Sequence, residues 1–136
     1  MRHGMFVGVM VLFVLGLSGC GDLSGQTNSV DAGGMLAHNV YFTLHDNAEA
    51  EQEALVQDCF EYLKDQPGIV FFAAGTLAEE YDRPVNVTDF DVSLHIVFDS
   101  VASHDRYQDA ADHLTFIERN EDNWESVRVF DSMVEQ

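Results

Sequence analysis

Six histidines are the residues of this 136-residue chain best able to bind a metal ion or move a proton near neutral pH. No two of them stand at the short spacings typical of zinc sites, so the sequence predicts no metal site. His45 and His104 are expected at the exposed flanks of turns. Phosphate loops, nucleophile elbows and dinucleotide fingerprints are also absent from the sequence, so we expect no bound cofactor.

Two histidines fall within expected strands and are candidates for a binding site. His38 shares an alternating strand face with Val40 and Phe42, so it either lines a cavity or is a hydrogen-bonded core histidine. Leu94 lies on the apolar face of the third expected strand, whereas His95 points the other way, towards a cavity or solvent. We take His38, Val40, Phe42 and Leu94 as the candidate binding residues.

The two cysteines have different surroundings. Cys59 falls on the apolar stripe of an expected helix and is interpreted as a small core residue rather than a nucleophile. Cys20 ends the N-terminal segment, so a disulfide within the chain is not expected if Cys20 carries a lipid.

The N-terminal segment has the features of an export signal. A basic start at Arg2 precedes an apolar run over residues 5–17, which is too short for a permanent membrane span. The run ends in Leu-Ser-Gly-Cys20, which resembles the bacterial lipobox, where the cysteine receives a lipid after cleavage. Residues 1–20 are therefore predicted to be a lipoprotein signal, with an ordinary signal peptide as the alternative. Residues 21–36, rich in Gly, Ser, Asn and Asp, are expected to form a flexible linker.

The chain is strongly acidic, with 24 Asp and Glu against 6 Lys and Arg and a net charge of −18. Phosphate backbones would repel such a surface, so the composition argues against nucleic-acid binding. Anionic lipid headgroups would repel it too. We therefore expect an exported protein on the periplasmic side of a bacterial cell membrane, attached only through the lipid on Cys20.

Hydrophobic periodicity predicts an α+β domain of the ferredoxin-like β-α-β-β-α-β type, with a four-stranded antiparallel sheet and helices on one face. Asp46-Asn47 and Asp99 or Ser100 are the expected helix caps. The expected elements are a strand at 38–44, a helix ending at 66–68, strands at 69–74 and 89–98, a helix to about 109, a short helix or turn at 112–119 and a strand at 124–130.

The second strand is apolar on both sides. Regular alternation would point Ile69 and Phe71 one way and Val70 and Phe72 the other. Helices on one face would leave the other face uncovered, so a second layer is required. The simplest solution is a symmetric homodimer through the sheet faces, which encloses a chamber if polar side chains line part of it.

Several short pieces of the chain match one family pattern in order. They are His38 in the first strand, Pro67-Gly68-Ile69 before the second, Gly75 after it, Asp91 before the third, Phe98-Asp99 at its end, the run 107–113, and the closing run 127–131. In this order the chain resembles the stress-responsive A/B barrel domain, a member of the dimeric α/β barrel superfamily, over residues 37–134.

The resemblance implies roles for two side chains. By similarity to the plant polyketide cyclases of the family, Tyr107 and His113 would act as an acid/base pair; Ala110-Ala111 replace the family's central His-Pro. An imidazole of pKa ~6.5 can take a proton, and a phenol of pKa ~10 can donate one to an enolate oxygen. One continuous helix would separate the two side chains, so they meet only if the chain bends. Alternatively, both side chains bond to the backbone and hold the helix end.

Two functions follow as hypotheses. The first is a binding module whose dimer barrel holds a small apolar or aromatic molecule. The second is a cofactor-free lyase, cyclase or monooxygenase that uses Tyr107 and His113. A haem-binding relative is a third option, which would need an axial histidine in the cavity.

Overall fold

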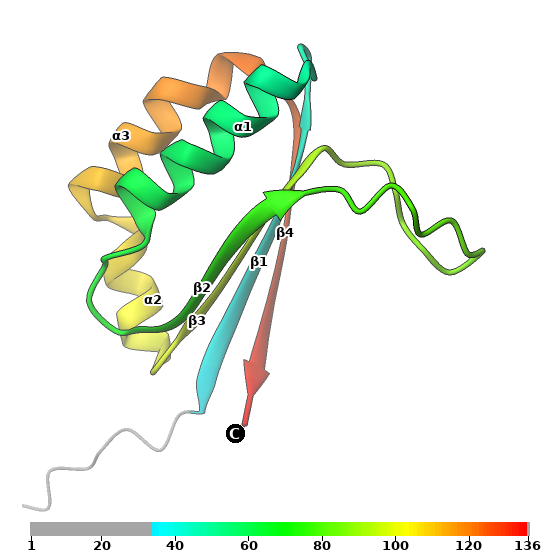
Figure 1. The fold of residues 1–136 in the computed structure, drawn as a ribbon. Coiled ribbons are helices and arrows are strands. Elements are labelled where there is room, and N and C mark those ends of the chain that lie inside the picture. The colour runs from blue at the N-terminus through cyan, green and yellow to red at the C-terminus, as the bar shows by residue number, and fades with distance from the viewer. Residues whose placement is uncertain (1–33, 136) are drawn as a thin grey trace, which may run out of the picture.

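The computed structural model describes residues 34–135, so the expected signal peptide, Cys20 and nearly all of the expected linker lie outside the described residues. A four-stranded antiparallel sheet carries the helices on one face (Figure 1). The elements are β1 (Met35–Leu44), α1 (Glu49–Asp58), the π-helical segment η1 (Cys59–Leu63), β2 (Ile69–Thr76), β3 (Val92–Phe98), α2 (Val101–Gln108), α3 (Ala111–Asn120), the 3-10 segment η2 (Glu121–Asn123) and β4 (Trp124–Val134). The predicted ferredoxin-like fold is confirmed.

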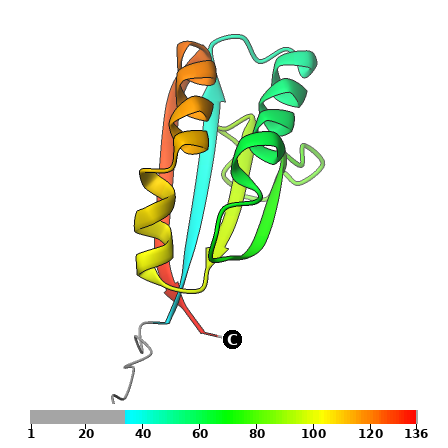
Figure 2. The same cartoon turned by 90° about the vertical axis from the view of Figure 1, so that its left-hand side faces the viewer.

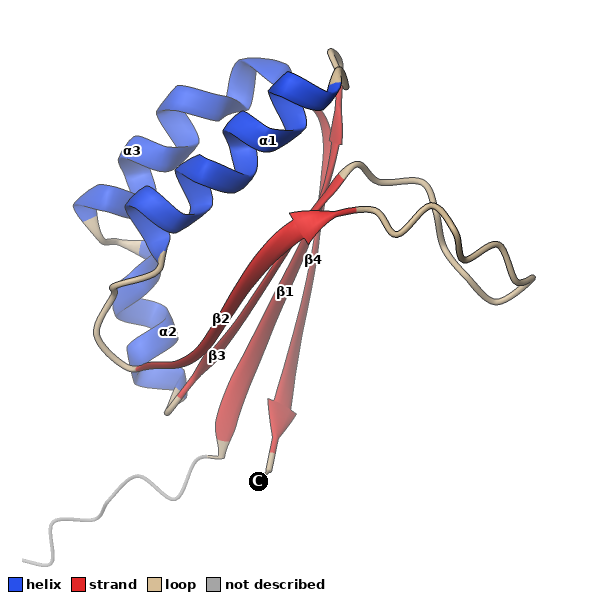
Figure 3. Cartoon of the chain, viewed as in Figure 1, coloured by secondary structure: helices blue, strands red, loops and turns tan. Residues whose placement is uncertain are grey.

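The strands lie in the order β2-β3-β1-β4, so β1 and β3 are the inner strands (Figure 3). All three pairings are antiparallel. Turning the molecule shows α1 above the β2–β3 side of the sheet and α3 above the β1–β4 side (Figure 2). The opposite sheet face carries no helix of the described chain (Figure 1).

Alternation along the inner strands determines which side chains enter the core. In β3, Val92, Leu94, Ile96 and Phe98 point towards the helices and are essentially inaccessible to solvent. The helices meet them with Leu55, Cys59, Leu63, Tyr107 and Phe116. The apolar face recognised in the sequence is therefore the face that the helices cover.

Several strand boundaries differ from those expected. β1 begins at Met35, and β4 continues to Val134, because these two residues pair with each other. β3 begins at Val92 rather than at residue 89, because the aspartates just before it belong to the loop between β2 and β3. Asp91 uses its carboxylate to accept a hydrogen bond from the Leu44 backbone N–H, at 2.8 Å.

A β-bulge changes the expected alternation in β2. The register shifts between Ile69, which pairs with Phe98, and Phe71, which pairs with Val97. The extra residue at the bulge is Val70, so Ile69 and Phe72 both pack against the core while Phe71 points to the open face. The prediction that Ile69 and Phe71 share a face was therefore wrong.

The helix starts are stabilised by polar side chains near the expected positions. Ser100 caps α2, because its hydroxyl accepts a hydrogen bond from the Ser103 backbone N–H at 3.2 Å. Asp46 accepts from the Ala48 N–H at 3.2 Å and so forms a turn before α1, whose N-cap is Ala48 itself.

A tight contact joins the turn before β2 to α2. Gly68 has φ +91°, and a Cβ at this position would lie 2.3 Å from Ser103 Oγ. Its carbonyl accepts the Asp99 N–H at 2.8 Å, which brings the starts of β2 and α2 together. Only glycine satisfies both the backbone conformation and the close approach.

We therefore expect Gly68→Ala to lower the free energy of unfolding by roughly 2–4 kcal/mol, through backbone strain and overpacking. The measurement is urea denaturation followed by circular dichroism. Gly75→Ala is the control, because a Cβ there meets no atom within 4 Å. Equal unfolding midpoints for the two variants would contradict the steric argument.

Candidate functional site

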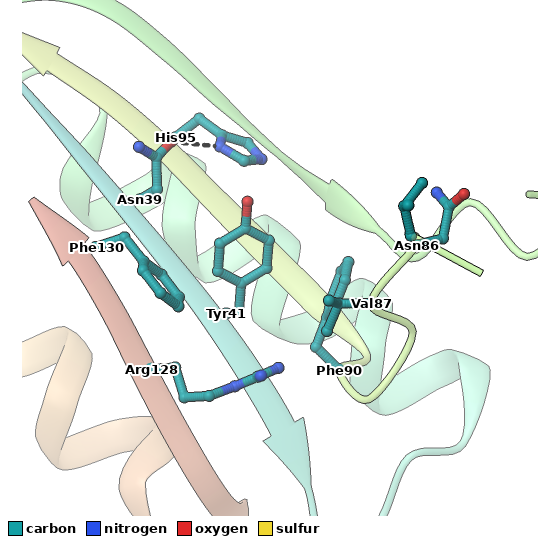
Figure 4. A pocket seen from close by; sticks show the side chains of 9 residues that line it. Asn39, Tyr41, Asn86, Val87, Phe90, His95, Arg128 and Phe130 are labelled. Atoms are coloured by element: carbon teal, nitrogen blue, oxygen red, sulfur yellow. Dashed lines mark hydrogen bonds between the residues drawn. The ribbon is translucent and has the colours of Figure 1, made fainter. Parts of the chain in front are cut away.

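The open face of the sheet contains a hollow of about 600 Å³ (Figure 4). Its floor comes from β1, β3 and β4, and its end wall comes from the loop between β2 and β3 over residues 77–91. The lining side chains are Asn39, Tyr41, Val85, Asn86, Val87, Phe90, His95, Arg128 and Phe130.

Strand alternation explains why these side chains share one face. Asn39 pairs with both His95 and Phe130 across three neighbouring strands, and Tyr41 pairs with Arg128. Residues in register point to the same side of a sheet. The floor of the hollow therefore consists of the β1 residues that alternate with the core residues of that strand, together with their partners in β3 and β4.

Tyr41 forms the centre of an aromatic group in the hollow. Its ring makes edge-on contacts with Phe90, His95 and Phe130, with ring centroids 4.9, 5.8 and 5.7 Å apart. Such edge-to-face pairs stabilise a fixed arrangement of rings. The hollow therefore offers a rigid aromatic surface to a bound molecule.

His95 supplies a neutral polar group beside these rings. Its Nδ1–H donates to Asn39 Oδ1 at 2.7 Å, and Nε2 is 3.2 Å from the Ser93 hydroxyl, which donates to it. Partial burial lowers the pKa of His95 below its usual 6.5. At neutral pH the imidazole is therefore uncharged.

Arg128 connects the loop to the sheet at the edge of the hollow. Its guanidinium donates to the two carboxylate oxygens of Asp89 at 2.6 and 3.3 Å and to the Asp89 carbonyl at 3.3 Å. A two-pronged pair of this kind has a defined orientation. Because both side chains are substantially exposed, its contribution to stability is modest.

A second group of polar rings lies on the helix side of the sheet. Tyr107 lies in the last turn of α2 and His113 lies in α3, and their ring centroids are 4.4 Å apart. The helix breaks between them at Ala110, whose backbone is extended. The bend that the two residues require is therefore present.

The hydrogen bond made by His113 leaves one of its two ring nitrogens free. His113 Nδ1–H donates to the Gln108 carbonyl at 3.0 Å, so Nε2 carries the free lone pair. Burial lowers the pKa of His113 and raises that of Tyr107. Both groups are therefore neutral at pH 7, the protonation states that a base and an acid need, while the same shifts make His113 a weaker base and Tyr107 a weaker acid. Neither side chain lines the hollow of the open face.

The candidate binding residues from the sequence also lie on the helix side. Val40, Phe42 and Leu94 are 5, 2 and 1 % exposed and belong to the core beneath the helices. His38 is 5 % exposed, and its Nδ1 lies 2.7 Å from Asp131 Oδ1, so it is a hydrogen-bonded core histidine. The expectation that Val40, Phe42 and Leu94 line a binding chamber is corrected, because the helices cover the face on which they lie. For His38 the structure agrees with the core alternative.

The residues that do line the hollow were mostly missed. Only His95 was a candidate, with its direction left open. The available signal was the second set of alternating positions in β1, Asn39 and Tyr41, which are polar or aromatic and so resemble an ordinary solvent face.

Cys59 is confirmed as a core residue. It is completely buried, and burial, aided by the neighbouring Asp58, raises its pKa to about 12. A thiol in this state is a poor nucleophile.

Within residues 34–135, no helix has the length and apolar character needed to cross a bilayer.

Comparison with known families decides the classification. The family model described as stress responsive A/B barrel domain matches residues 36–134. The chain belongs to this family. A search of curated proteins found no significant match.

Solved structures agree with the assignment. A structure from Mesorhizobium loti, described as an A/B barrel family protein with a ferredoxin-like fold, is 25 % identical, with a TM-score of 0.62 over 76 % of this chain and 99 % of that one. A dimeric ferredoxin-like protein of unknown function from Thermobifida fusca is 15 % identical, with a TM-score of 0.62 over 76 % and 93 %. A hydroxynitrile lyase from Passiflora edulis is 16 % identical, with a TM-score of 0.61 over 76 % and 96 %.

The environment of His95 predicts how it titrates. Since its pKa in the folded chain lies below the unfolded value, the unfolded chain binds more protons in this range, and stability falls as pH drops through about 6.5. An NMR titration should place the His95 pKa below 6.5, the usual value of histidine. The unfolding free energy of a His95→Gln variant should lose this part of the pH dependence. A His95 pKa at or above 6.5 would contradict the burial argument.

The burial of Cys59 predicts slow thiol chemistry. In a chain carrying Cys20→Ser, Cys59 is the one remaining thiol. We expect its reaction with a disulfide reagent to be at least about a hundredfold slower in the folded chain than in denaturant. In the folded chain the reagent cannot reach the sulfur, and the sulfur stays in the unreactive thiol form. Complete modification of the folded chain within seconds would contradict this.

Proposed function

We propose that this protein binds a small aromatic molecule in the hollow of its open sheet face. A second copy of the chain would close the hollow, and a lipid on Cys20 would hold the dimer on the periplasmic side of a bacterial membrane. The observation that carries the proposal is the hollow itself, with its ordered aromatic rings and few polar groups.

The chemistry of the lining supports an aromatic ligand. Tyr41, Phe90 and Phe130 supply faces and edges for stacking, while the Asn39 amide N–H and the Arg128 guanidinium supply hydrogen-bond donors at the margin. Small-molecule sites typically combine apolar walls with a few polar groups and measure roughly 300–1,000 Å³. The hollow, at about 600 Å³, has this size.

Exposed apolar groups support the dimer. Phe71 and Phe130, on the open face, are 54 and 55 % exposed. Uncovered apolar surface of this kind is typical of an interface. Similar structures are described as dimeric ferredoxin-like proteins, from Thermobifida fusca and Bacteroides fragilis. A two-fold pairing of open faces would bury these side chains and deepen the hollow.

The lipid anchor is supported by the sequence alone. The basic start, apolar run and Leu-Ser-Gly-Cys20 occur in the order of a lipoprotein signal. The acidic composition makes direct adsorption to anionic lipid unfavourable, so a covalent anchor is the consistent means of attachment.

Ligand binding is tested by thermal unfolding of the full chain in the presence of aromatic and polyketide-like compounds. A compound at ten times its Kd should raise Tm by roughly 5 °C or more. Tyr41→Ala should abolish this ligand-dependent rise, because it removes the central ring. Tyr81→Ala is the matched control, since Tyr81 belongs to the same loop region but does not line the hollow.

No stabilisation across the panel, or an equal rise for the Tyr41→Ala variant, would overturn the binding proposal. The dimer is checked separately by light scattering. A monomer at micromolar concentration would remove the proposed closure of the hollow.

The anchor is tested by detergent phase partitioning after expression in a bacterial host. The natural chain should enter the detergent phase, and Cys20→Ser should shift it to the aqueous phase or leave an uncleaved precursor. Cys59→Ser serves as the control and should behave like the natural chain. Identical partitioning and size for all three would exclude lipidation at Cys20.

A second candidate function is supported by the contact between Tyr107 and His113. Their adjacency and the free Nε2 of His113 fit a proton-transfer pair for a cofactor-free cyclase or lyase. A linear poly-β-ketone thioester mimic is a suitable probe, with ring closure followed by absorbance. Tyr107→Phe and His113→Gln should each reduce the rate by about a hundredfold or more, whereas His45→Gln should not change it. No cyclisation above background by the natural chain would count against this candidate.

A further inference from the structure

Three possible metal ligands from distant parts of the chain meet at one end of the sheet. His38 lies in β1, Asp131 pairs with it directly across in β4, and His104 lies in α2. One donor atom from each of the three lies within 4.8 Å of the other two. The ring centroids of His38 and His104 are 5.1 Å apart.

We propose that His38, His104 and Asp131 form a binding site for Zn²⁺ or a related first-row divalent ion. Two imidazoles and one carboxylate are a donor set typical of these metals, and imidazole disfavours Mg²⁺ and Ca²⁺. Three protein ligands leave a coordination position for water or a ligand, as in sites that bind or activate small molecules.

The distances are compatible with coordination after small side-chain movements. Around a tetrahedral zinc ion with bonds of about 2.0–2.1 Å, donor atoms stand roughly 3.3 Å apart. His38 Nδ1 and Asp131 Oδ1 are already 2.7 Å apart. Two imidazoles on one such ion have ring centroids roughly 5 Å apart, which is the separation of His38 and His104. Since the donor atom of His104 lies within 4.8 Å of the other two, coordination requires it to move closer by at most about 1.5 Å.

The surroundings hold the two rings in place. Phe98 packs edge-on against His104 with ring centroids 5.5 Å apart, and the Tyr107 ring lies 6.0 Å from that of His38. The Gln108 amide lies 2.9 Å from His104 Nε2 and would orient the ring or move aside for a metal ion. His38 is buried and His104 half-buried, whereas Asp131 is exposed, so an ion would approach from the Asp131 side.

The charges favour a cation at this position. Asp131 bears the carboxylate of the group, and Asp105 lies 3.5 Å from His104 Nδ1. The chain as a whole has a net charge of −18, so its field attracts cations. Coordination through His38 Nδ1 would require the proton that this nitrogen donates to Asp131 to move to Nε2, so that the imidazole stays neutral.

The test uses the full chain in detergent, purified without a histidine tag and treated with a chelator. Co²⁺ is the probe, because its visible absorption reports the coordination number. We expect one equivalent to bind with intense bands of four- or five-coordinate Co²⁺, and Zn²⁺ to displace it. His104→Gln should weaken Co²⁺ binding by at least about tenfold. His45→Gln, a matched change at an exposed histidine, should bind like the natural chain.

Two results would overturn the proposal. One is equal Co²⁺ affinity in the His104→Gln and natural chains, which would indicate diffuse binding to carboxylates. The other is the absence of visible bands at 100-fold excess Co²⁺. Circular dichroism and urea unfolding without metal provide the folding control. His104 is the chosen ligand because it lies in α2 rather than in an inner strand and is not part of the apolar core cluster.

Discussion

All helices of the described chain lie on one face of the sheet, and the rest of the structure depends on this one-sided covering. The covered face is filled by strand residues such as Phe42, Leu94 and Phe98, and its burial provides the main apolar core. The uncovered face cannot use the same residues, because neighbouring positions of a strand point in opposite directions. Its rings and polar groups are therefore free to form a hollow rather than a dense core.

Adjacent residues of β1 consequently belong to two different chemical environments. His38 points towards the helices and Asp131, while Asn39 points towards the hollow and His95. The polar groups of the two faces are separated by the thickness of one sheet, and each has its own hydrogen-bond partners. The hollow suits reversible binding of a ring, whereas the helix side gathers histidines and a tyrosine close enough for proton transfer or metal coordination. The proposed functions thus do not compete for the same side chains.

Local patterns in the sequence were sufficient for the order of elements, the Ser100 cap and the buried state of Cys59, since each depends on nearby residues. They also indicated correctly that Tyr107 and His113 need a bend to meet. Periodicity identified the apolar strand face but not how completely the helices fill it, so Val40, Phe42 and Leu94 were assigned to a binding chamber rather than to the core. It also could not reveal the bulge at Val70. The meeting of His38 with His104 depends on how α2 packs against β1, and no spacing rule contains that information. Lipidation and dimer formation remain predictions.

The pairing of Met35 with Val134 places both ends of the domain at one corner of the sheet. The loop over residues 77–91 joins β2 and β3 at the opposite end, beside Phe42 rather than Leu36. The ten residues of β1 separate the two ends by roughly 30 Å. In a chain attached to a bilayer through Cys20, the linker would therefore join the domain at the end of the sheet opposite the loop that walls the hollow. The attachment point and the site would be separated by the length of one strand.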